Sequence, residues 1–182
     1  MTTTLIIAGS PSGTSRTLRV AEAVGKRLTS LGTTVSVLEV RKLPSEALLH
    51  AKFDDPALVE AIQQVEAADG IVIATPVYKA AYSGLLKAFL DVLPQFGLRG
   101  KVVLPLATGG SLAHVLAIDY ALRPVLSSLD AWHVVSGLFL LDRQLVPTEA
   151  GGIEIEPEVS ARLDVLLNAY VQSLNAARAL QF

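Results

Sequence analysis

The chain has 182 residues, of which 51% are hydrophobic and only 18% are charged, and it contains no cysteine. This composition excludes a disordered chain, which requires low hydrophobicity and high charge, and the lack of cysteine excludes disulfides, thiol catalysis and thiolate-bound metals. The net charge of −2 provides neither the basic field of a nucleic-acid binder nor the strongly acidic surface of an electron carrier.

The length fits a single domain over residues 1–182. The N-terminal residues lack the basic region of a signal peptide, and no apolar run approaches the roughly 20 residues that span a bilayer. We therefore expect a cytoplasmic protein with no membrane partner. The small share of charged residues favours a homo-oligomer that hides part of its surface, with a monomer rich in alanine and leucine as the alternative.

Short β-branched runs alternate with longer segments of helical period. Strands are predicted over Thr4–Ala8, Thr33–Val40, Gly70–Thr75, Lys101–Ala107 and Trp132–Leu140. Helices are predicted over Ser15–Leu31, Pro56–Ala68, Ser83–Leu93, Ser111–Leu129 and Pro157–Leu180. Before the last helix, Asp142–Glu156 is expected to be a surface excursion, in which Ile153–Ile155 forms either a short strand or part of a loop.

The strand segments Leu5–Ala8 and Ile71–Ala74 are apolar on both sides, as in a parallel sheet covered by helices on both faces. The sequence therefore predicts an α/β, doubly wound fold with a five-stranded parallel sheet in the flavodoxin-like order 2-1-3-4-5. Ligands of such sheets bind beyond the carboxyl ends of the strands. A site is expected in the loops that follow Ala8, Thr75 and Ala107.

The loop after the first strand, Gly9–Thr17, is rich in hydroxyl groups and leads directly into a helix. It matches neither the Walker A loop nor the dinucleotide-binding glycine turn. The free amides and dipole of a helix N-terminus attract an anion, and the planar fork of Arg16 suits a phosphate. We expect the terminal phosphate of a mononucleotide here. The simpler alternative is that Ser15 only caps the helix and Arg16 is solvated.

The other two loops suit a planar ring. Pro76 and Tyr78 follow the third strand, where backbone amides and a flat side chain can lie along a ring system. The paired glycines Gly109 and Gly110 follow the fourth strand and allow a ligand to approach the backbone closely. Each loop alone has an ordinary structural explanation, so the prediction of a site rests on the three together.

Three motifs carry a resemblance to a known family. They are Gly9-Ser10-Pro11 with Ser15-Arg16, Thr75-Pro76-Val77-Tyr78-Lys79 with Ser83-Gly84, and Ala107-Thr108-Gly109-Gly110-Ser111 with His114. Together they resemble the flavodoxin-like NADPH-dependent FMN reductases, and most closely the reductase component of two-component alkanesulfonate monooxygenase systems. The resemblance extends over essentially the whole chain, and its most specific part is the helix Leu112–Leu126.

The resemblance implies that FMN and NADPH are the cofactors. It implies that the FMN phosphate is bound by Ser10, Ser12, Ser15, Arg16 and Thr17. It also implies that the isoalloxazine ring lies against Pro76, Val77, Tyr78 and Lys79, with Thr108, Gly109, Gly110 and Ser111 at its other edge. Tyr120 matches a tyrosine that forms a π-bulge at the tetramer interface of the alkanesulfonate members, in which FMN is a released substrate.

The segment Ser111–Leu129 has almost no polar face, which by itself predicts a buried helix. Burial between subunits is the simpler explanation in so small a domain, with burial inside one subunit as the alternative. Pro124 is expected to kink this helix. A tetramer, or a dimer when flavin is bound, is the expected assembly.

No catalytic residue is assigned, because hydride transfer from a nicotinamide to a flavin is carried out by the two cofactors. The scattered histidines predict no metal site, and His114 is either a ligand contact or a structural residue. Arg16, Lys79 and Arg99 are the candidates for contact with the 2′-phosphate that distinguishes NADPH from NADH.

The expected function is an NAD(P)H-dependent FMN reductase that supplies reduced FMN to a flavin-dependent alkanesulfonate monooxygenase. One alternative is a quinone or azo reductase with tightly bound FMN. A flavin-binding module without turnover, such as an electron carrier or a sensor, is the other, and the near-neutral charge disfavours the carrier.

Overall fold

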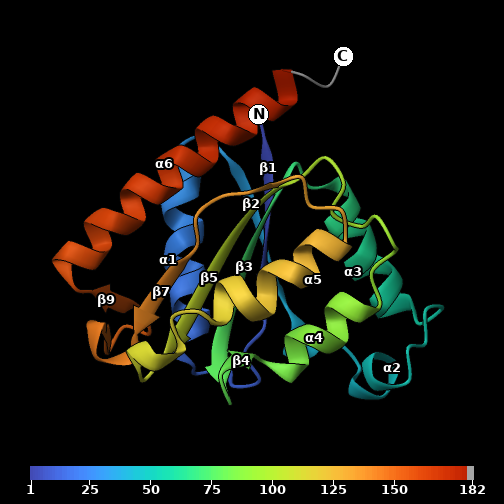
Figure 1. The fold of residues 1–182 in the computed structure, drawn as a ribbon, viewed down its shortest axis with the longest axis horizontal. Coiled ribbons are helices and arrows are strands. Elements are labelled where there is room, and N and C mark those ends of the chain that lie inside the picture. The colour runs from blue at the N-terminus through green and yellow to red at the C-terminus, as the bar shows by residue number, and fades with distance from the viewer. Residues whose placement is uncertain (180–182) are drawn as a thin grey trace.

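The computed structural model describes residues 1–179, and a parallel sheet forms its centre (Figure 1). The main strands are β1 (Thr3–Ala8), β2 (Thr34–Glu39), β3 (Gly70–Tyr78), β5 (Val102–Gly109) and, at one edge, β6 (His133–Val134) with β7 (Leu138–Leu141). They pair in parallel in the order β2-β1-β3-β5-β6, and β7 also pairs with β5. The predicted strand order is confirmed.

Helices cover both faces of this sheet. One face carries α1 (Arg16–Ser30) and α6 (Pro157–Ala179), and the other carries α2 (Ser45–Leu49), α3 (Pro56–Ala67), α4 (Gly84–Asp91) and α5 (Arg123–Ser128) (Figure 1). Side chains alternate between the two cores along each strand, so Ile6 packs with the α1 side and Ile7 with the other. The predicted end of the last helix, Leu180, lies outside the described residues.

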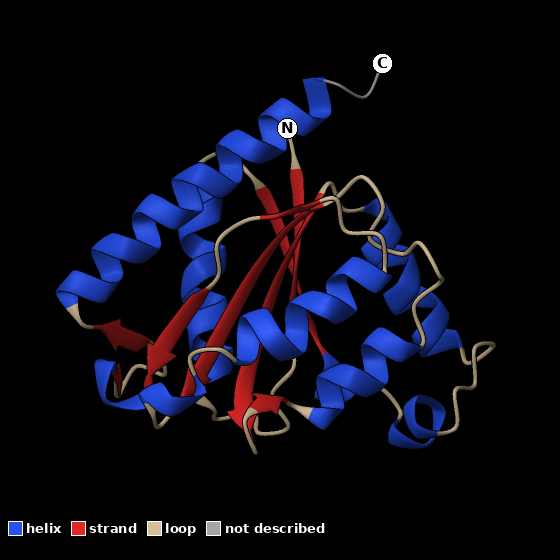
Figure 2. Cartoon of the chain, in the orientation of Figure 1, coloured by secondary structure: helices blue, strands red, loops and turns tan. Residues whose placement is uncertain are grey.

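The carboxyl ends of the main strands lie at one edge of the sheet, where the arrowheads in Figure 2 gather. The loops that follow β1, β3 and β5 leave from this edge. Since these three strands are neighbours, their loops lie side by side. The N-terminus lies at the opposite edge (Figure 2).

The last predicted strand is interrupted in the structure. Residues 135–137 separate β6 from β7 and stand opposite residues 104–105 of β5. Pro105 has no backbone N–H to donate, and Gly137 packs so tightly that a Cβ would lie 2.9 Å from Ile118 Cγ2. Trp132, predicted to begin this strand, lies outside it and is 74% exposed.

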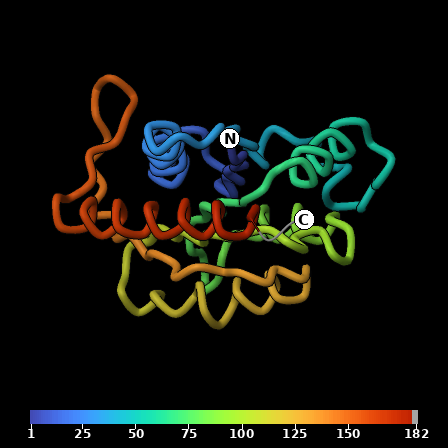
Figure 3. Tube along the Cα trace, turned by 90° about the horizontal axis from the view of Figure 1, so that it is seen from above, coloured from blue at the N-terminus to red at the C-terminus, as the bar shows by residue number. Residues whose placement is uncertain are grey.

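The excursion before α6 contains the short strand that the sequence left open. Strands β8 (Leu145–Pro147) and β9 (Ile153–Ile155) form an antiparallel hairpin. Figure 3 shows this hairpin, in orange, standing beside the first helix, in blue. Arg19 on α1 donates from Nη1 to the carbonyl of Gly152, at 3.5 Å.

The prediction of one continuous helix over Ser111–Leu129 is wrong. The segment consists of a 3₁₀ turn, η2 (Leu112–His114), a π-helical turn, η3 (Ile118–Leu122), and then α5. Pro124 lies in the first turn of α5 and has no N–H, so the carbonyl of Tyr120 lacks its α-helical donor. The missing bond favours the wider turn at this point.

Candidate functional site

The loop after β1 joins a buried strand end to the first turn of α1. Ser15 caps this helix, since its Oγ accepts a hydrogen bond from the amide of Leu18 at 3.1 Å. The amides of Arg16 and Thr17 have no hydrogen-bond partner among residues 1–179. Free amides at a helix N-terminus are the groups that hold a phosphate.

The serine hydroxyls of this loop have different surroundings. Ser10 is buried, and its Oγ accepts a hydrogen bond from the amide of Ser12 at 3.3 Å. Ser12, Gly13 and Thr14 are exposed at the tip of the loop. Ser10 therefore shapes the loop from beneath, whereas Ser12 and Ser15 border the side that a ligand can reach.

A second arginine, which the sequence analysis missed, lies against this loop. The guanidinium of Arg41 packs on Gly13 so closely that a Cβ there would lie 2.9 Å from Arg41 Cζ. Its Nη2 is 2.8 Å from Glu39 Oε2, and Lys42 Nζ is 2.5 Å from Glu39 Oε1. Burial alone would raise the pKa of Glu39, but hydrogen bonds from Lys42 and Arg41 lower it below its ordinary value. Only the pairing of β1 with β2 brings Arg41 to the loop, so the sequence carried no local signal for it.

The loop after β3 is a tight hairpin. β3 continues through Pro76 to Tyr78, turns at Lys79 and Ala80, and pairs with β4 (Ala81–Tyr82). Lys79 and Ala80 have φ of 50° and 64°, the left-handed conformation that two-residue hairpin turns require and that Asn-Gly normally supplies. Tyr78, Lys79 and Ala80 are exposed at the tip, while Val77 is buried.

The third loop begins inside β5. Pro76 of β3 pairs with Thr108 of β5, so the predicted ring-binding segments are neighbours. Gly109 has no room for a side chain, because a Cβ would lie 2.9 Å from Phe139 Cζ. Gly110 and Ser111 are exposed, and Ser111 Oγ accepts a hydrogen bond from the amide of Ala113 at 3.2 Å.

A hollow of about 500 Å³ separates the hairpin tip from the π-helical turn. Its wall is made mostly of alanines, together with His114, Leu116 and Tyr120. Tyr120 is 79% exposed, and Leu112, Val115 and Leu116 are exposed with it. Within one subunit this apolar segment is therefore only partly covered, contrary to the alternative that a single subunit buries it.

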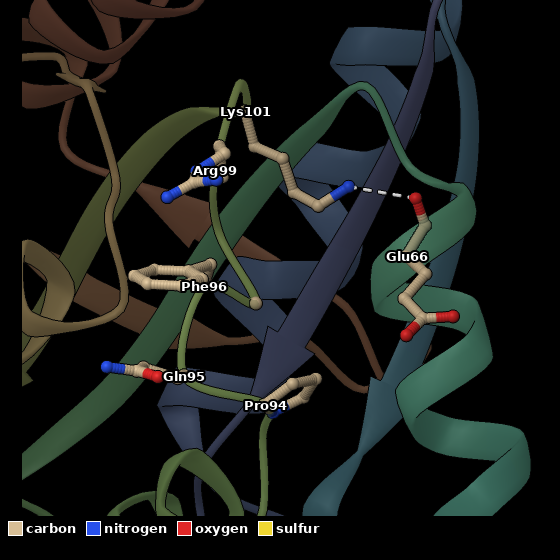
Figure 4. Close-up of a pocket in the computed structure, with 7 residues that line it drawn as sticks. Glu66, Pro94, Gln95, Phe96, Arg99 and Lys101 are labelled. Atoms are coloured by element: carbon tan, nitrogen blue, oxygen red, sulfur yellow. Dashed lines mark hydrogen bonds between the residues drawn. The ribbon is translucent and has the colours of Figure 1, made fainter.

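Arg99 does not belong to this edge of the sheet. It precedes β5 at the amino edge, in a pocket of about 440 Å³ together with Phe96 and Lys101 (Figure 4). Arg99 is paired with Asp130 and lies 4.1 Å from the centre of the Phe96 ring. Lys101 Nζ donates to the carbonyls of Glu66 and Ala68, and burial lowers its pKa. Of the three cations considered for the 2′-phosphate, Arg99 is thus excluded by position.

Residues 1–179 contain neither a metal-binding cluster nor a membrane-spanning helix. Within that range no group of three histidine, aspartate or glutamate side chains is placed to hold a metal ion. No helix in the same part of the chain is long and apolar enough to cross a membrane.

Comparison with known proteins agrees with this architecture. The family model for NADPH-dependent FMN reductase matches residues 2–145. The FMN reductase (NADPH) of Escherichia coli K12 is 45% identical over 94% of this chain and 89% of its own length. The FMN reductase (NADPH) of Pseudomonas putida KT2440 is 49% identical over 79% of this chain and 73% of its own length. The apo crystal structure of the NADH:FMN oxidoreductase EMOB has 42% identity and a TM-score of 0.87, covering 95% of this chain and 90% of that one.

Proposed function

The chain belongs to the NADPH-dependent FMN reductase family, and we propose that it takes FMN at the three loops as a loosely held substrate. Its reaction is that of an NAD(P)H:FMN oxidoreductase, with NADPH and FMN as cofactors. Hydride passes between the nicotinamide and flavin rings themselves. The residues of the chain therefore have to bind the rings, orient them and exclude side reactions.

The phosphate is assigned to the start of α1. The start of α1 and the loop before it carry the free amides of Arg16 and Thr17, the hydroxyls of Ser12 and Ser15 and the exposed side chain of Arg16. Ser10 supports the loop from beneath. This cluster of donors beside two ring-binding loops is the observation that carries the proposal.

The ring is assigned to the neighbouring loops. One edge would meet the backbone of Pro76 and Val77 with Tyr78 and Lys79, and the other edge would meet Gly109, Gly110 and Ser111. The pairing of β3 with β5 supports this assignment, since it places the two segments side by side. Tyr78 is 51% exposed, and the tip of the loop Gly9–Thr17, here called the phosphate loop, is exposed as well. This exposure favours release of the flavin after reduction.

The released product would be reduced FMN for a flavin-dependent alkanesulfonate monooxygenase in the cytoplasm. The proposal of a homo-oligomer, a tetramer or a dimer with flavin bound, rests on the exposed apolar row of Leu112, Val115, Leu116 and Tyr120. A row of this kind on a small soluble domain is typical of a subunit interface.

Aerobic oxidation of NADPH by the purified protein, with and without added FMN, tests whether the flavin is a substrate. We expect a nearly colourless protein whose NADPH oxidation requires added FMN. A yellow protein that oxidises NADPH unaided, and faster with a quinone, would instead establish a reductase with tightly bound FMN.

The partner requires its own assay. Adding the reductase, NADPH and FMN to a purified alkanesulfonate monooxygenase should support turnover of an alkanesulfonate. An unrelated source of reduced FMN serves as the positive control. If that control works and the reductase does not, the assignment of the partner is wrong.

A further inference from the structure

Two threonines that were predicted to contact FMN are hydrogen-bonded to each other through their side chains. Thr17 lies in the first turn of α1, and Thr108 lies near the end of β5. Their Oγ1 atoms are 2.6 Å apart, and the residues are only 2% and 4% exposed. The contact joins the phosphate loop to the ring loop across 91 positions of sequence.

The two hydroxyls bond only to each other. Among residues 1–179, neither has another hydrogen-bond partner, so one hydroxyl donates and the other accepts. A buried hydroxyl that loses its partner is costly, whereas two apolar side chains of the same shape can replace such a pair at little cost. The two hydroxyls are therefore expected to act as a unit.

The other end of the phosphate loop is held in the same way. Gly9 donates its N–H to the carbonyl of Ala74 at 2.8 Å and accepts a hydrogen bond from the hydroxyl of Ser83. The amide of Ser83 donates to Thr75 Oγ1 at 3.0 Å. A side chain at Gly9 would collide with Leu86, since the Cβ atoms would lie 2.7 Å apart.

The phosphate loop is thus fixed at its start to β3 and α4, and at its end to β5. The two ring-binding loops follow β3 and β5, so the loop at Gly9–Thr17 is fixed to both strands that carry them. FMN has its phosphate and its ring at opposite ends of one molecule. A site that holds both ends must keep its two halves at a set separation, and such preorganisation improves affinity.

We propose that the Thr17–Thr108 pair is a positioning latch, which sets the separation of the phosphate loop and the ring loops without touching FMN. This inference rests on the proposed function and refines it, because it removes both hydroxyls from the ligand contacts that the sequence predicted. The phosphate would then be bound by Ser12, Ser15, Arg16 and the amide of Thr17, and not by the Thr17 hydroxyl.

A double-mutant cycle tests the latch. Thr17→Val, Thr108→Val and the double variant each remove hydroxyls at nearly constant shape, and Thr17→Ser keeps the hydroxyl as a matched control. The KM and kcat for FMN and for riboflavin, which lacks the phosphate, are measured with NADPH, and the melting temperature reports folding.

We expect each valine variant to raise the KM for FMN about fivefold, the effect of one neutral hydrogen bond, and to leave kcat and the KM for riboflavin nearly unchanged. The double variant should also show about a fivefold rise, since one contact is lost once. Thr17→Ser should behave like the parent.

Three results would overturn the latch. A rise of about 25-fold in the double variant, the product of the single effects, would mean that each hydroxyl binds the flavin separately. An equal rise for riboflavin would show a general structural role, and no rise in either single variant would show that the contact is dispensable. Failure of the proposed function is distinct from all three, because the parent protein would then not reduce FMN.

Discussion

Arg16 donates a hydrogen bond from Nε to the carbonyl of Leu145, at a distance of 3.1 Å and across 129 positions of sequence. The contact ties the start of α1 to the β8–β9 hairpin and holds the guanidinium beside the phosphate loop. The two terminal nitrogens of Arg16 have no partner among residues 1–179, and they are the ones that we expect to meet the phosphate.

Arg16→Ala is expected to weaken FMN binding by about 1.5–3 kcal/mol, the range for a hydrogen bond to a charged group. Riboflavin binding should change little. Titration of each flavin by fluorescence measures both effects. Arg19→Ala is the matched control, because Arg19 bonds to the same hairpin at Gly152. Equal losses in the two variants would mean that the hairpin, and not the phosphate contact, accounts for the effect.

Tyr120→Ala is expected to disturb the oligomer and to make the purified protein retain flavin, whereas the parent should be nearly colourless. Tyr120 lies in the π-helical turn and exposes 79% of its surface, so its main contacts should come from another subunit. Light scattering gives the mass of the assembly, and the visible spectrum gives the flavin content. Val165→Ala should alter neither, because Val165 on α6 is 72% exposed but does not belong to the apolar row of Leu112, Val115, Leu116 and Tyr120. A Tyr120→Ala protein that is colourless and has the mass of the parent contradicts this role.

Ala80→Gly is expected to stabilise the protein by about 0.5–1 kcal/mol, because Ala80 has a φ of 64° and glycine avoids the left-handed penalty. Urea unfolding measures the gain in the free energy of unfolding. Ala81→Gly, in the adjacent strand β4, should be destabilising, since glycine weakens a strand. A loss of stability at position 80 as large as that at position 81 would show that the left-handed turn carries no strain.

The ion pair of Asp130 with Arg99 predicts a pH-dependent stability. Hydrogen bonds from Arg99 and Trp132 hold the pKa of Asp130 below its ordinary value of 3.8. A carboxyl with a lowered pKa stabilises the fold fully above its unfolded value, and this contribution is lost as the pH falls through the folded value. Asp130→Asn should therefore be less stable than the parent at pH 7, and the difference should shrink as the pH falls below 3.8. Asparagine suits the φ of 65° at this position, so a difference that is independent of pH would exclude the charge as its cause.

The strands at the centre of the sheet were predictable because their signal is local. Residues 5–8 and 71–74 are apolar at every position, as is typical of short strands buried on both faces. The start of α1 was also recognisable, since Ser15 caps this helix from within one turn. Hydroxyls and an arginine at that helix start indicate an anion site wherever the helix is placed.

Other features depend on partners that lie far away in the sequence. The hairpin at Lys79 and Ala80 contains no Asn-Gly or other turn signal, and it extends from β3, which is held in place by β1 and β5. The break between β6 and β7 follows from Pro105 on the neighbouring strand and from the packing of Gly137 on Ile118. Neither cause is visible in the segment that it changes.

By itself, the sequence determined the type of fold, the order of its strands and the edge at which a ligand is expected. These follow from the period of apolar residues and from the residues at the strand ends. The tertiary structure alone decided which side chains at that edge are exposed and which face one another. It turned Thr17 toward Thr108, placed Arg41 on Gly13 and moved Arg99 to the opposite edge. The direction of a side chain depends on what packs beside it, and distant parts of the chain supply those neighbours.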